Sequence, residues 1–321
     1  MPRPRKRQVS LSDTPYYHCI SRCVRRAFLC GKDPLTSFDF SHRRQWLVSR
    51  LKLVSEVFAV DLCAYAVMSN HYHVVVRIDR DRAQSWTARE VAERWTQLFA
   101  GAPLVQRWIS GEILQDAELN RAHAYTEQYR ERMSDLSWFM RCVNEPIARL
   151  ANAEDRCTGR FWEGRFKSQA LLDERALLAC MAYVDLNPIR AAIAKTPEES
   201  NYTSIKERIE DPESDTLMPF SESNTAQGSL PFHYRDYLEL VDWSGRAVRD
   251  GKKGHMAESA PPILQRLGMV PEYLLDYLQT RPESFHCALG PVSLMRQIAA
   301  SLKLKFVHGI DVGRRLCPER S

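Results

Sequence analysis

Apolar positions in the first part of the chain change their spacing from one segment to the next, and the order of patterns predicts strand, helix, strand, strand. Residues 15–29, PYYHCISRCVRRAFL, are rich in β-branched and aromatic side chains, which is typical of a strand. Residues 41–58 repeat apolar side chains at a helical period after a capping serine. The apolar runs at 59–68 and 73–78 are joined by a Ser-Asn pair, which predicts adjacent antiparallel strands with a tight connection.

Two more helices and an extended segment are expected in the middle of the chain. Residues 87–100 and 134–152 have helical periodicity, and Pro146 predicts a kink or a break in the second helix because proline lacks the backbone donor. Residues 159–172, GRFWEGRFKSQALL, predict extended chain that contains turns.

A further helix is expected in the segment DERALLACMAYVDLNP. Asp173 is its expected N-cap, and the pair Asn187 and Pro188 marks its expected end, because a residue before proline disfavours the α region. Together the elements predict an α+β fold with an antiparallel sheet and helices packed on a face. The expected organisation is a basic arm at 1–12, the α+β domain at 13–205, a polar linker at 206–231 and a helical region of unknown role at 232–321.

Composition narrows the class of protein. The chain is 44% apolar and 26% charged, which is typical of a globular protein. No apolar run reaches the roughly 18 residues of a membrane span, and no apolar stretch follows the basic N-terminus, so we expect a cytoplasmic protein. The nine cysteines contain no C-x-x-C pair and no zinc spacing, which predicts reduced thiols.

Basic residues are informative through their distribution, since a net charge of +5 and a pI of about 8.7 alone do not identify a nucleic-acid binder. They gather in PRPRKR, in SRCVRR and in GRFWEGRFK. In the last segment Arg160, Arg165 and Lys167 are interleaved with aromatic rings that include Trp162. Rings stack on unpaired bases while basic groups hold phosphates, so this segment indicates contact with single-stranded or distorted nucleic acid. A solvated strand with inward-facing aromatics is the alternative.

Two histidines enter the valine run of the strand at 73–78. Side chains alternate along a strand, so His71 and His73 share one face while Tyr72 points to the other. Two imidazoles on one face suit a transition-metal ion but do not complete its ligand set. A third ligand must therefore come from elsewhere in the fold, unless both histidines are structural.

The segment AYVDLNP supplies candidates for the missing groups. Tyr183 and Asn187 are four residues apart on the expected helix, so both project toward one neighbourhood. The asparagine amide oxygen can complement two imidazoles, and the tyrosine is an oxygen nucleophile once activated. The alternative for Tyr183 is packing in the core.

A family resemblance rests on both segments. YAVMSNHYHVVV resembles the HUH signature (histidine, hydrophobic residue, histidine) of single-tyrosine transposases, including REP-associated tyrosine transposases. GRFWEGRFKSQALLDERALLACMAYVDLNPIRAAI resembles their tyrosine-helix block, and the matching order covers roughly residues 14–195. Tyr72 carries a hydroxyl at the hydrophobic position, and the residues after 210 lie outside the resemblance.

The resemblance implies a ferredoxin-like βαββαβ core and a DNA-processing activity. Carried over by position, His71, His73 and Asn187 would bind a divalent ion, Mg²⁺ or Mn²⁺. Tyr183 would attack a phosphate of single-stranded, hairpin-associated DNA, form a 5′-phosphotyrosine and leave a free 3′-hydroxyl. A second 3′-hydroxyl could then rejoin strands by transesterification. Arg160, Trp162, Arg165 and Lys167 would position the DNA.

Other functions stay open at this stage. One is a regulator that binds structured repeat DNA without cleaving it, and another is a metal-dependent hydrolase that uses water, with Tyr183 as a core residue. The sequence also leaves open the metal used, the DNA sequence recognised, and whether the site is built in one chain or in a homodimer with exchanged helices.

Overall fold

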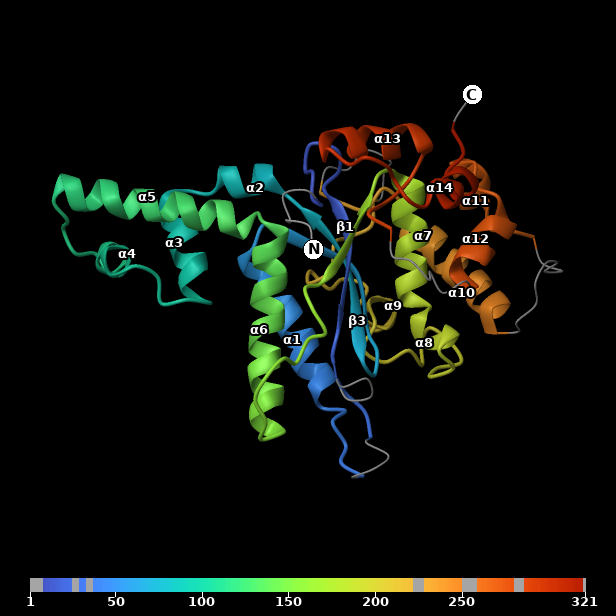
Figure 1. Cartoon of the computed structure of the whole chain (residues 1–321), viewed down its shortest axis with the longest axis horizontal. Helices are drawn as coiled ribbons and strands as arrows, with labels where there is room; N and C mark the ends of the chain where they lie inside the picture. The colour runs from blue at the N-terminus through green and yellow to red at the C-terminus, as the bar shows by residue number, and fades with distance from the viewer. Residues whose placement is uncertain are drawn as a thin grey trace. The chain divides into compact units, whose positions relative to one another are not determined.

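A computed structural model of the chain describes residues 8–24, 29–32, 37–221, 228–249, 259–279 and 286–319 (Figure 1). Its strands are β1 (Tyr16–Arg22), β2 (Val60–Val67), β3 (His71–Ile78), β4 (Lys167–Leu171) and β5 (Ala288–Leu289). Its helices are α1 (Arg43–Val57), α2 (Arg80–Ser85), α3 (Ala88–Thr96), α4 (Pro103–Ile109), α5 (Asp116–Met133), α6 (Leu136–Glu154), α7 (Glu174–Asp185), α8 (Asn187–Arg190), α9 (Ser204–Glu210), α10 (Tyr234–Arg249), α11 (Pro262–Leu267), α12 (Pro271–Gln279), α13 (Val292–Ser301) and α14 (Ile310–Leu316). The fold is α+β, as the hydrophobic pattern predicts.

The chain divides into two compact units. The first comprises Met1–Gln45, Leu62–Arg77 and Arg160–Ser321, and the second comprises Trp46–Asp61 and Ile78–Gly159. The division cuts across the boundaries expected from composition, because the segments of each unit are not contiguous in sequence. All the candidate metal and nucleophile residues belong to the first unit.

The first unit is built on one sheet with the strand order β2-β3-β1-β4-β5. β1 is antiparallel to both β3 and β4, and β4 is parallel to the short β5. The Met68 amide donates to the His71 carbonyl at 2.8 Å, which closes the tight connection expected between β2 and β3. β5 belongs to the C-terminal region, so that region contributes to the sheet and is not only helical.

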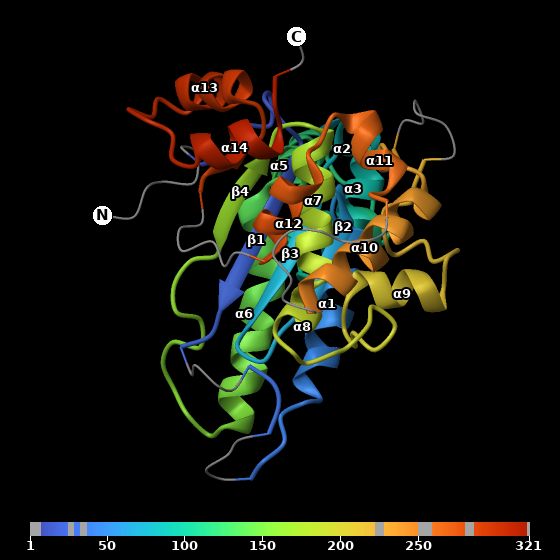
Figure 2. The same ribbon diagram turned by 90° about the vertical axis from the view of Figure 1, so that its right-hand side faces the viewer.

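Helix α7 lies against one side of this sheet (Figure 2). Asp173 caps it, accepting a hydrogen bond from the Ala176 amide at 2.9 Å, and the helix ends just before Asn187 and Pro188, so both expected ends are confirmed. Every residue from Arg175 to Asp185 is buried, which agrees with the apolar character of the segment on all sides. Its side chains share one apolar cluster with strand residues and with α10, α11 and α12.

A buried polar group ties the C-terminal end of α7 to α9 and α10. The Asp185 carboxylate accepts hydrogen bonds from the Ser204 hydroxyl at 2.5 Å, the Ile205 amide at 3.0 Å and the Tyr237 hydroxyl at 2.5 Å. Burial raises the pKa of Asp185 to about 6, while these hydrogen bonds and the charge of Arg208 oppose the rise. Helices α9 and α10 are thereby held beside the helix that carries Tyr183.

The segment 206–231, expected to be a polar linker, is packed over much of its described length. It begins within α9, and Leu217, Met218 and Leu230 are buried. Arg208 is also buried, with its guanidinium donating to the carbonyls of Cys63 and Met218 at 3.0 Å each. The described part of the segment is therefore anchored to the first unit by apolar and polar contacts.

The second unit is mainly helical. The rings of Trp95 and Tyr129 stack with centroids 4.6 Å apart, and the Arg130 guanidinium donates to the carbonyls of Ala83 and Trp86 at 2.6 Å each. α6 runs continuously through Pro146, so the break considered from the sequence does not occur. None of the described helices is long and apolar enough to cross a lipid bilayer.

Candidate active site

The register of the sheet places three histidines on one side. His71 lies opposite Arg22, His73 opposite Ile20, and His18 opposite Val75. Residues paired across strands point to the same side of a sheet, so these side chains share one surface. We call it the histidine face and define it by His18, His71 and His73; Gln169 and Lys167 of β4 join it as the partners of His18 and Ile20.

The imidazole of His73 contacts the other two imidazoles. The ring centroids of His71 and His73 are 4.9 Å apart and those of His18 and His73 are 5.1 Å apart. His18 Nε2 and His73 Nδ1 are 2.9 Å apart and form a buried hydrogen bond. His71 Nδ1 lies 2.6 Å from Asn70 Oδ1, so this nitrogen carries the proton and donates it.

Burial keeps two of these rings neutral. Burial lowers the pKa of His18 to about 3, although a hydrogen bond with the Gln169 side chain acts in the opposite direction. Burial also lowers the pKa of His73 well below its usual range, and positive charge on neighbouring histidines, Arg190 and Arg22 lowers it further. Neutral imidazoles are the form that binds metal ions.

Tyr183 of α7 faces the histidines. Its ring centroid is 5.8 Å from that of His73 and 6.3 Å from that of His18. The Arg190 guanidinium of α8 lies over the Tyr183 ring, 4.2 Å from its centroid, and its Nη2 donates to Asn187 Oδ1 at 2.8 Å. The structure thus joins Asn187 to the tyrosine through Arg190, a residue that the sequence reasoning did not single out.

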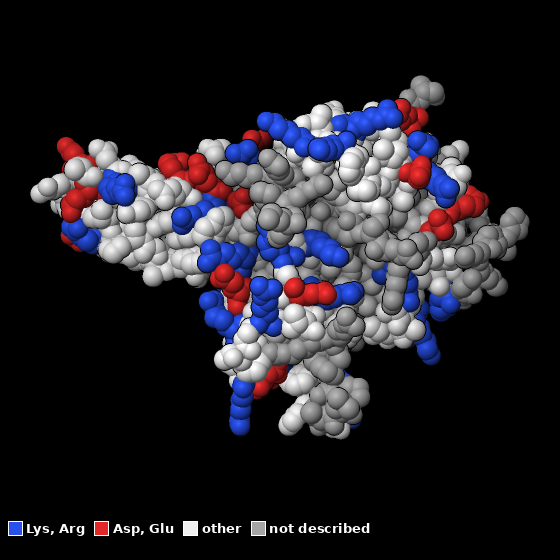
Figure 3. Space-filling view, in the orientation of Figure 1, with Lys and Arg blue, Asp and Glu red and all other residues white. Residues whose placement is uncertain are grey.

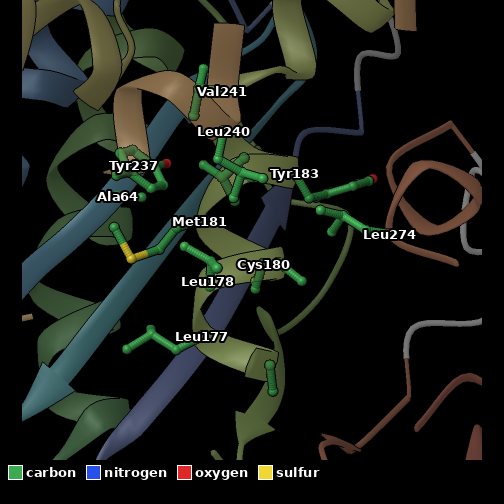
Figure 4. Packing of buried hydrophobic residues seen from close by; sticks show 14 of the residues in the cluster. Ala64, Leu177, Leu178, Cys180, Met181, Tyr183, Tyr237, Leu240, Val241 and Leu274 are labelled. Carbon is green, nitrogen blue, oxygen red and sulfur yellow. The ribbon is translucent and has the colours of Figure 1, made fainter. Parts of the chain in front are cut away.

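The C-terminal helix α12 packs against the same tyrosine. The Tyr277 ring centroid is 5.8 Å from that of Tyr183, and Leu274 belongs to the same apolar cluster (Figure 4). Only 6% of Tyr183 is exposed. Most of the Tyr183 side chain is therefore covered by its neighbours.

Two of the three expected ligand atoms are available for a divalent ion as the side chains lie, and the third is engaged in a hydrogen bond. His73 Nε2 is buried and has no hydrogen-bond partner in the described part of the chain, and proton donation from His71 Nδ1 leaves Nε2 of that ring with a lone pair. Asn187 Oδ1 is engaged by Arg190 and would have to leave it to bind metal. Within the described ranges no three His, Cys, Asp or Glu side chains are grouped as a metal site.

The residues expected to position DNA separate onto different surfaces. Lys167 is exposed and lies on the histidine face. Trp162 bridges to Cys23 and contacts Tyr72 with ring centroids 5.8 Å apart, which places it on the opposite side of the sheet. Arg160 and Arg165 are exposed beside it in sequence. The basic segment PRPRKR lies outside the described residues.

Exposed basic side chains also accompany the last helices. Arg296, Lys303 and Lys305 are exposed on α13 and the loop that follows it. In Figure 3 Lys and Arg side chains predominate along this edge of the molecule. This region lies outside the resemblance, and its charge indicates a second surface able to attract phosphate.

Comparisons with known proteins add little to this geometry. No family model matches the chain, and no curated protein matches it. One solved structure, described as a REP-associated tyrosine transposase bound to a REP hairpin, aligns over 67% of this chain and 90% of that chain, with 11% identity and a TM-score of 0.36. Similarity at this level carries no argument, so function must be argued from the side chains.

Proposed function

We propose that the chain is a metal-dependent DNA transposase of the HUH single-tyrosine type, with Tyr183 as its nucleophile. The observation that carries the proposal is the meeting of three elements: Tyr183 of α7 lies against His73 of β3, and Arg190 of α8 covers its ring. The strand order β4-β1-β3-β2, with β1 antiparallel to both neighbours, supports a ferredoxin-like core beneath this site.

Tyr183 would cleave one strand by substitution at phosphorus. Its hydroxyl loses a proton and attacks, a phosphorus–oxygen bond to the phenolic oxygen forms, and the bond to the 3′ oxygen breaks. The departing oxygen takes up a proton and becomes a free 3′-hydroxyl, while the 5′ phosphate stays on Tyr183. Another 3′-hydroxyl can attack this phosphotyrosine and rejoin DNA without ATP, because the phosphodiester energy is retained.

Arg190 is suited to assist the nucleophile and the phosphate. Its guanidinium carbon lies 4.2 Å from the centroid of the Tyr183 ring, so it is close to the place where the phosphate would react. Its Nη1 is buried and has no hydrogen-bond partner among the described residues, and a non-bridging phosphate oxygen is an acceptor of the right charge. Arg190 would therefore hold the phosphate beside the nucleophile.

His71 and His73 would hold a divalent ion, Mg²⁺ or Mn²⁺, with Asn187 as the third ligand after it releases Arg190. When bound, the ion would supply positive charge to a non-bridging phosphate oxygen. The alternation of the strand directs both imidazoles to one side, and the buried valines that follow hold the strand in place. Lys167, exposed on the same face, would contact the backbone of single-stranded or hairpin DNA.

A DNA-binding regulator without cleavage activity is the second candidate, and two observations favour it. Only 6% of Tyr183 is exposed, its ring lies beside that of Tyr277, and Asn187 Oδ1 accepts a hydrogen bond from Arg190. If these contacts persist on DNA, the protein binds hairpins but cannot react with them.

A strand-transfer assay separates these functions. Protein, Mn²⁺ and a hairpin oligonucleotide labelled at its 3′ end are mixed with an unlabelled acceptor that has a free 3′-hydroxyl. We expect labelled joint molecules without ATP, and none with a chelator or with the double variant His71→Ala, His73→Ala. Cleavage without transfer would indicate hydrolysis by water, and binding without cleavage would indicate the regulator.

A further inference from the structure

The connection between β2 and β3 is held by two other segments at the end of the sheet where His71 lies. The Cys23 amide donates to the Asn70 carbonyl at 3.0 Å, and the Cys30 amide donates to the Ser69 carbonyl at 3.0 Å. The chain on both sides of this connection is therefore fixed beside the start of β3, which carries the proposed metal ligand His71.

A further stretch of chain, just before α1, is fixed to these segments in turn. The Phe40 amide donates to the Gly31 carbonyl at 2.9 Å, and Asp39 forms an antiparallel bridge with Lys32. The buried Arg43 guanidinium lies over the Phe40 ring, 4.1 Å from its centroid. In Figures 1 and 2 the chain before α1 lies at the same end of the sheet as α8. Backbone contacts therefore run from the β2–β3 connection to Asp39.

Phe38 is a large apolar side chain that this arrangement leaves exposed. Its exposed fraction is 67%, and its ring centroid lies 6.4 Å from that of the anchored Phe40. The Asp39 carboxylate between the two rings in sequence accepts a hydrogen bond from the Ser41 amide at 2.8 Å. Phe38 therefore presents a flat apolar surface to solvent, and unpaired bases stack on such surfaces.

Arg22 adds positive charge at the same end of the sheet. It is the exposed last residue of β1 and lies opposite His71, so its side chain is on the histidine face. The Glu163 amide donates to the Arg22 carbonyl at 2.8 Å, which places the basic and aromatic segment with Arg160 alongside. In residues 22–24, 29–32, 37–40 and 159–163 the exposed cations outnumber the exposed carboxylates: Arg22, Lys32 and Arg160 against Asp39 and Glu163.

We propose that this end of the sheet binds the unpaired DNA strand next to the reacting phosphate, with Phe38 stacking on a base and Arg22 contacting a backbone phosphate. The inference rests on the proposed function, which makes single-stranded, hairpin-associated DNA the substrate. Stacking on a ring tolerates every base but requires that the base be unpaired. The surface therefore adds affinity for the single-stranded flank of a hairpin and none for its base-paired stem.

Substitutions of Phe38 test the stacking. Phe38→Leu removes the ring but keeps an apolar side chain, and Phe38→Trp keeps a ring. Ile113→Ala, at a residue 95% exposed in the second unit, is the control for loss of an exposed apolar side chain. The full chain without metal is mixed with a fluorescein-labelled hairpin from the flanks of the gene, made either with unpaired thymidines on each side or without them. Binding is followed by fluorescence anisotropy.

We expect Phe38→Leu to raise the Kd for the hairpin with unpaired thymidines about 5- to 100-fold and to leave the Kd for the other hairpin unchanged. Phe38→Trp and Ile113→Ala should bind both hairpins as the wild type does. A fluorescent aminopurine base moved through the flank should be quenched at one position by the wild type and not by Phe38→Leu. Arg22→Met should lower the slope of log binding constant against log salt concentration by about 0.7 and keep the quenching.

The outcomes distinguish this inference from the proposed function. If Phe38→Leu binds and quenches the flank as the wild type does, the stacking role is overturned, and an adduct on Tyr183 can still form. If Phe38→Leu changes the oligomeric state in analytical ultracentrifugation and leaves both Kd values unchanged, Phe38 contacts a second copy of the chain and the DNA role is overturned. If the wild type binds neither hairpin, the proposed function fails and the inference falls with it.

Discussion

Replacing Tyr237 by phenylalanine should cost more stability than any other single hydroxyl deletion on α10. The Tyr237 hydroxyl donates to Asp185 Oδ2 at 2.5 Å, and both residues are fully buried. At pH 8 Asp185 is ionised, since its pKa is about 6, and a hydrogen bond to a charged group contributes about 1.5–3 kcal/mol. Tyr237→Phe should therefore lower the free energy of unfolding by about 2 kcal/mol.

Tyr234 on the same helix provides the matched control. Its hydroxyl donates to the Arg208 carbonyl at 2.7 Å, a neutral acceptor in a partly exposed place, so Tyr234→Phe should cost about 0.5–1.5 kcal/mol. Because the chain has two units, native-state hydrogen exchange of α10 and α7 amides is a better measure than one global transition. Equal losses of protection in the two variants would refute the idea that Asp185 anchors α7 through a charged hydrogen bond.

Three further predictions follow from the same contacts. Arg190→Met should slow formation of the DNA adduct by about 100-fold, and Arg190→Lys should slow it by less, with hairpin affinity preserved in both variants. Unchanged rates would show that Arg190 does not assist the reaction. Burial raises the pKa of Asp185 from 3.8 to about 6, so the folded state holds this proton more tightly than the unfolded state does. Roughly 3 kcal/mol of stability that is present below pH 4 is therefore lost as the pH rises through 6. Asp185→Asn should remove that part of the pH dependence of the free energy of unfolding in denaturant titrations, and an unaltered pH dependence would contradict the assignment. Lys167→Ala should reduce the slope of log binding constant against log salt concentration for single-stranded DNA by about 0.7. Trp162→Phe, on the other side of the sheet, should leave this slope unchanged. The reverse result would place the DNA on the side of the sheet opposite the histidine face.

Local patterns were sufficient for the parts of the fold that local interactions determine. The strand on either side of the Ser-Asn connection, the capped start of α7 at Asp173 and its end before Pro188 all follow from residues adjacent in sequence. β5 was not predicted, because a two-residue strand has no periodicity and forms only by pairing with β4. The burial of Leu217 was also missed, because a single apolar residue in a polar segment has no periodicity and is buried only by contacts distant in sequence.

In the candidate site too, sequence spacing assigns only residues whose placement depends on local structure. Alternation along β3 was enough to place His71 and His73 on one side, and helical spacing brought Tyr183 and Asn187 into one region. His18 requires the β1–β3 register, and Arg190 requires the turn between α7 and α8, so neither could be assigned from spacing alone. The ligand role of Asn187 and the nucleophile role of Tyr183 stay predictions.

The nucleophile can be identified as the residue that becomes covalently attached to DNA. Protein is incubated with Mn²⁺ and a 3′-labelled hairpin, denatured, digested and analysed by mass spectrometry. Tyr277→Phe is the matched control, because its ring lies 5.8 Å from that of Tyr183. We expect a phosphotyrosyl–DNA linkage on Tyr183 that persists in Tyr277→Phe and is absent in Tyr183→Phe. An adduct that survives in Tyr183→Phe, or the absence of an adduct with any hairpin from the flanks of the gene, would contradict it.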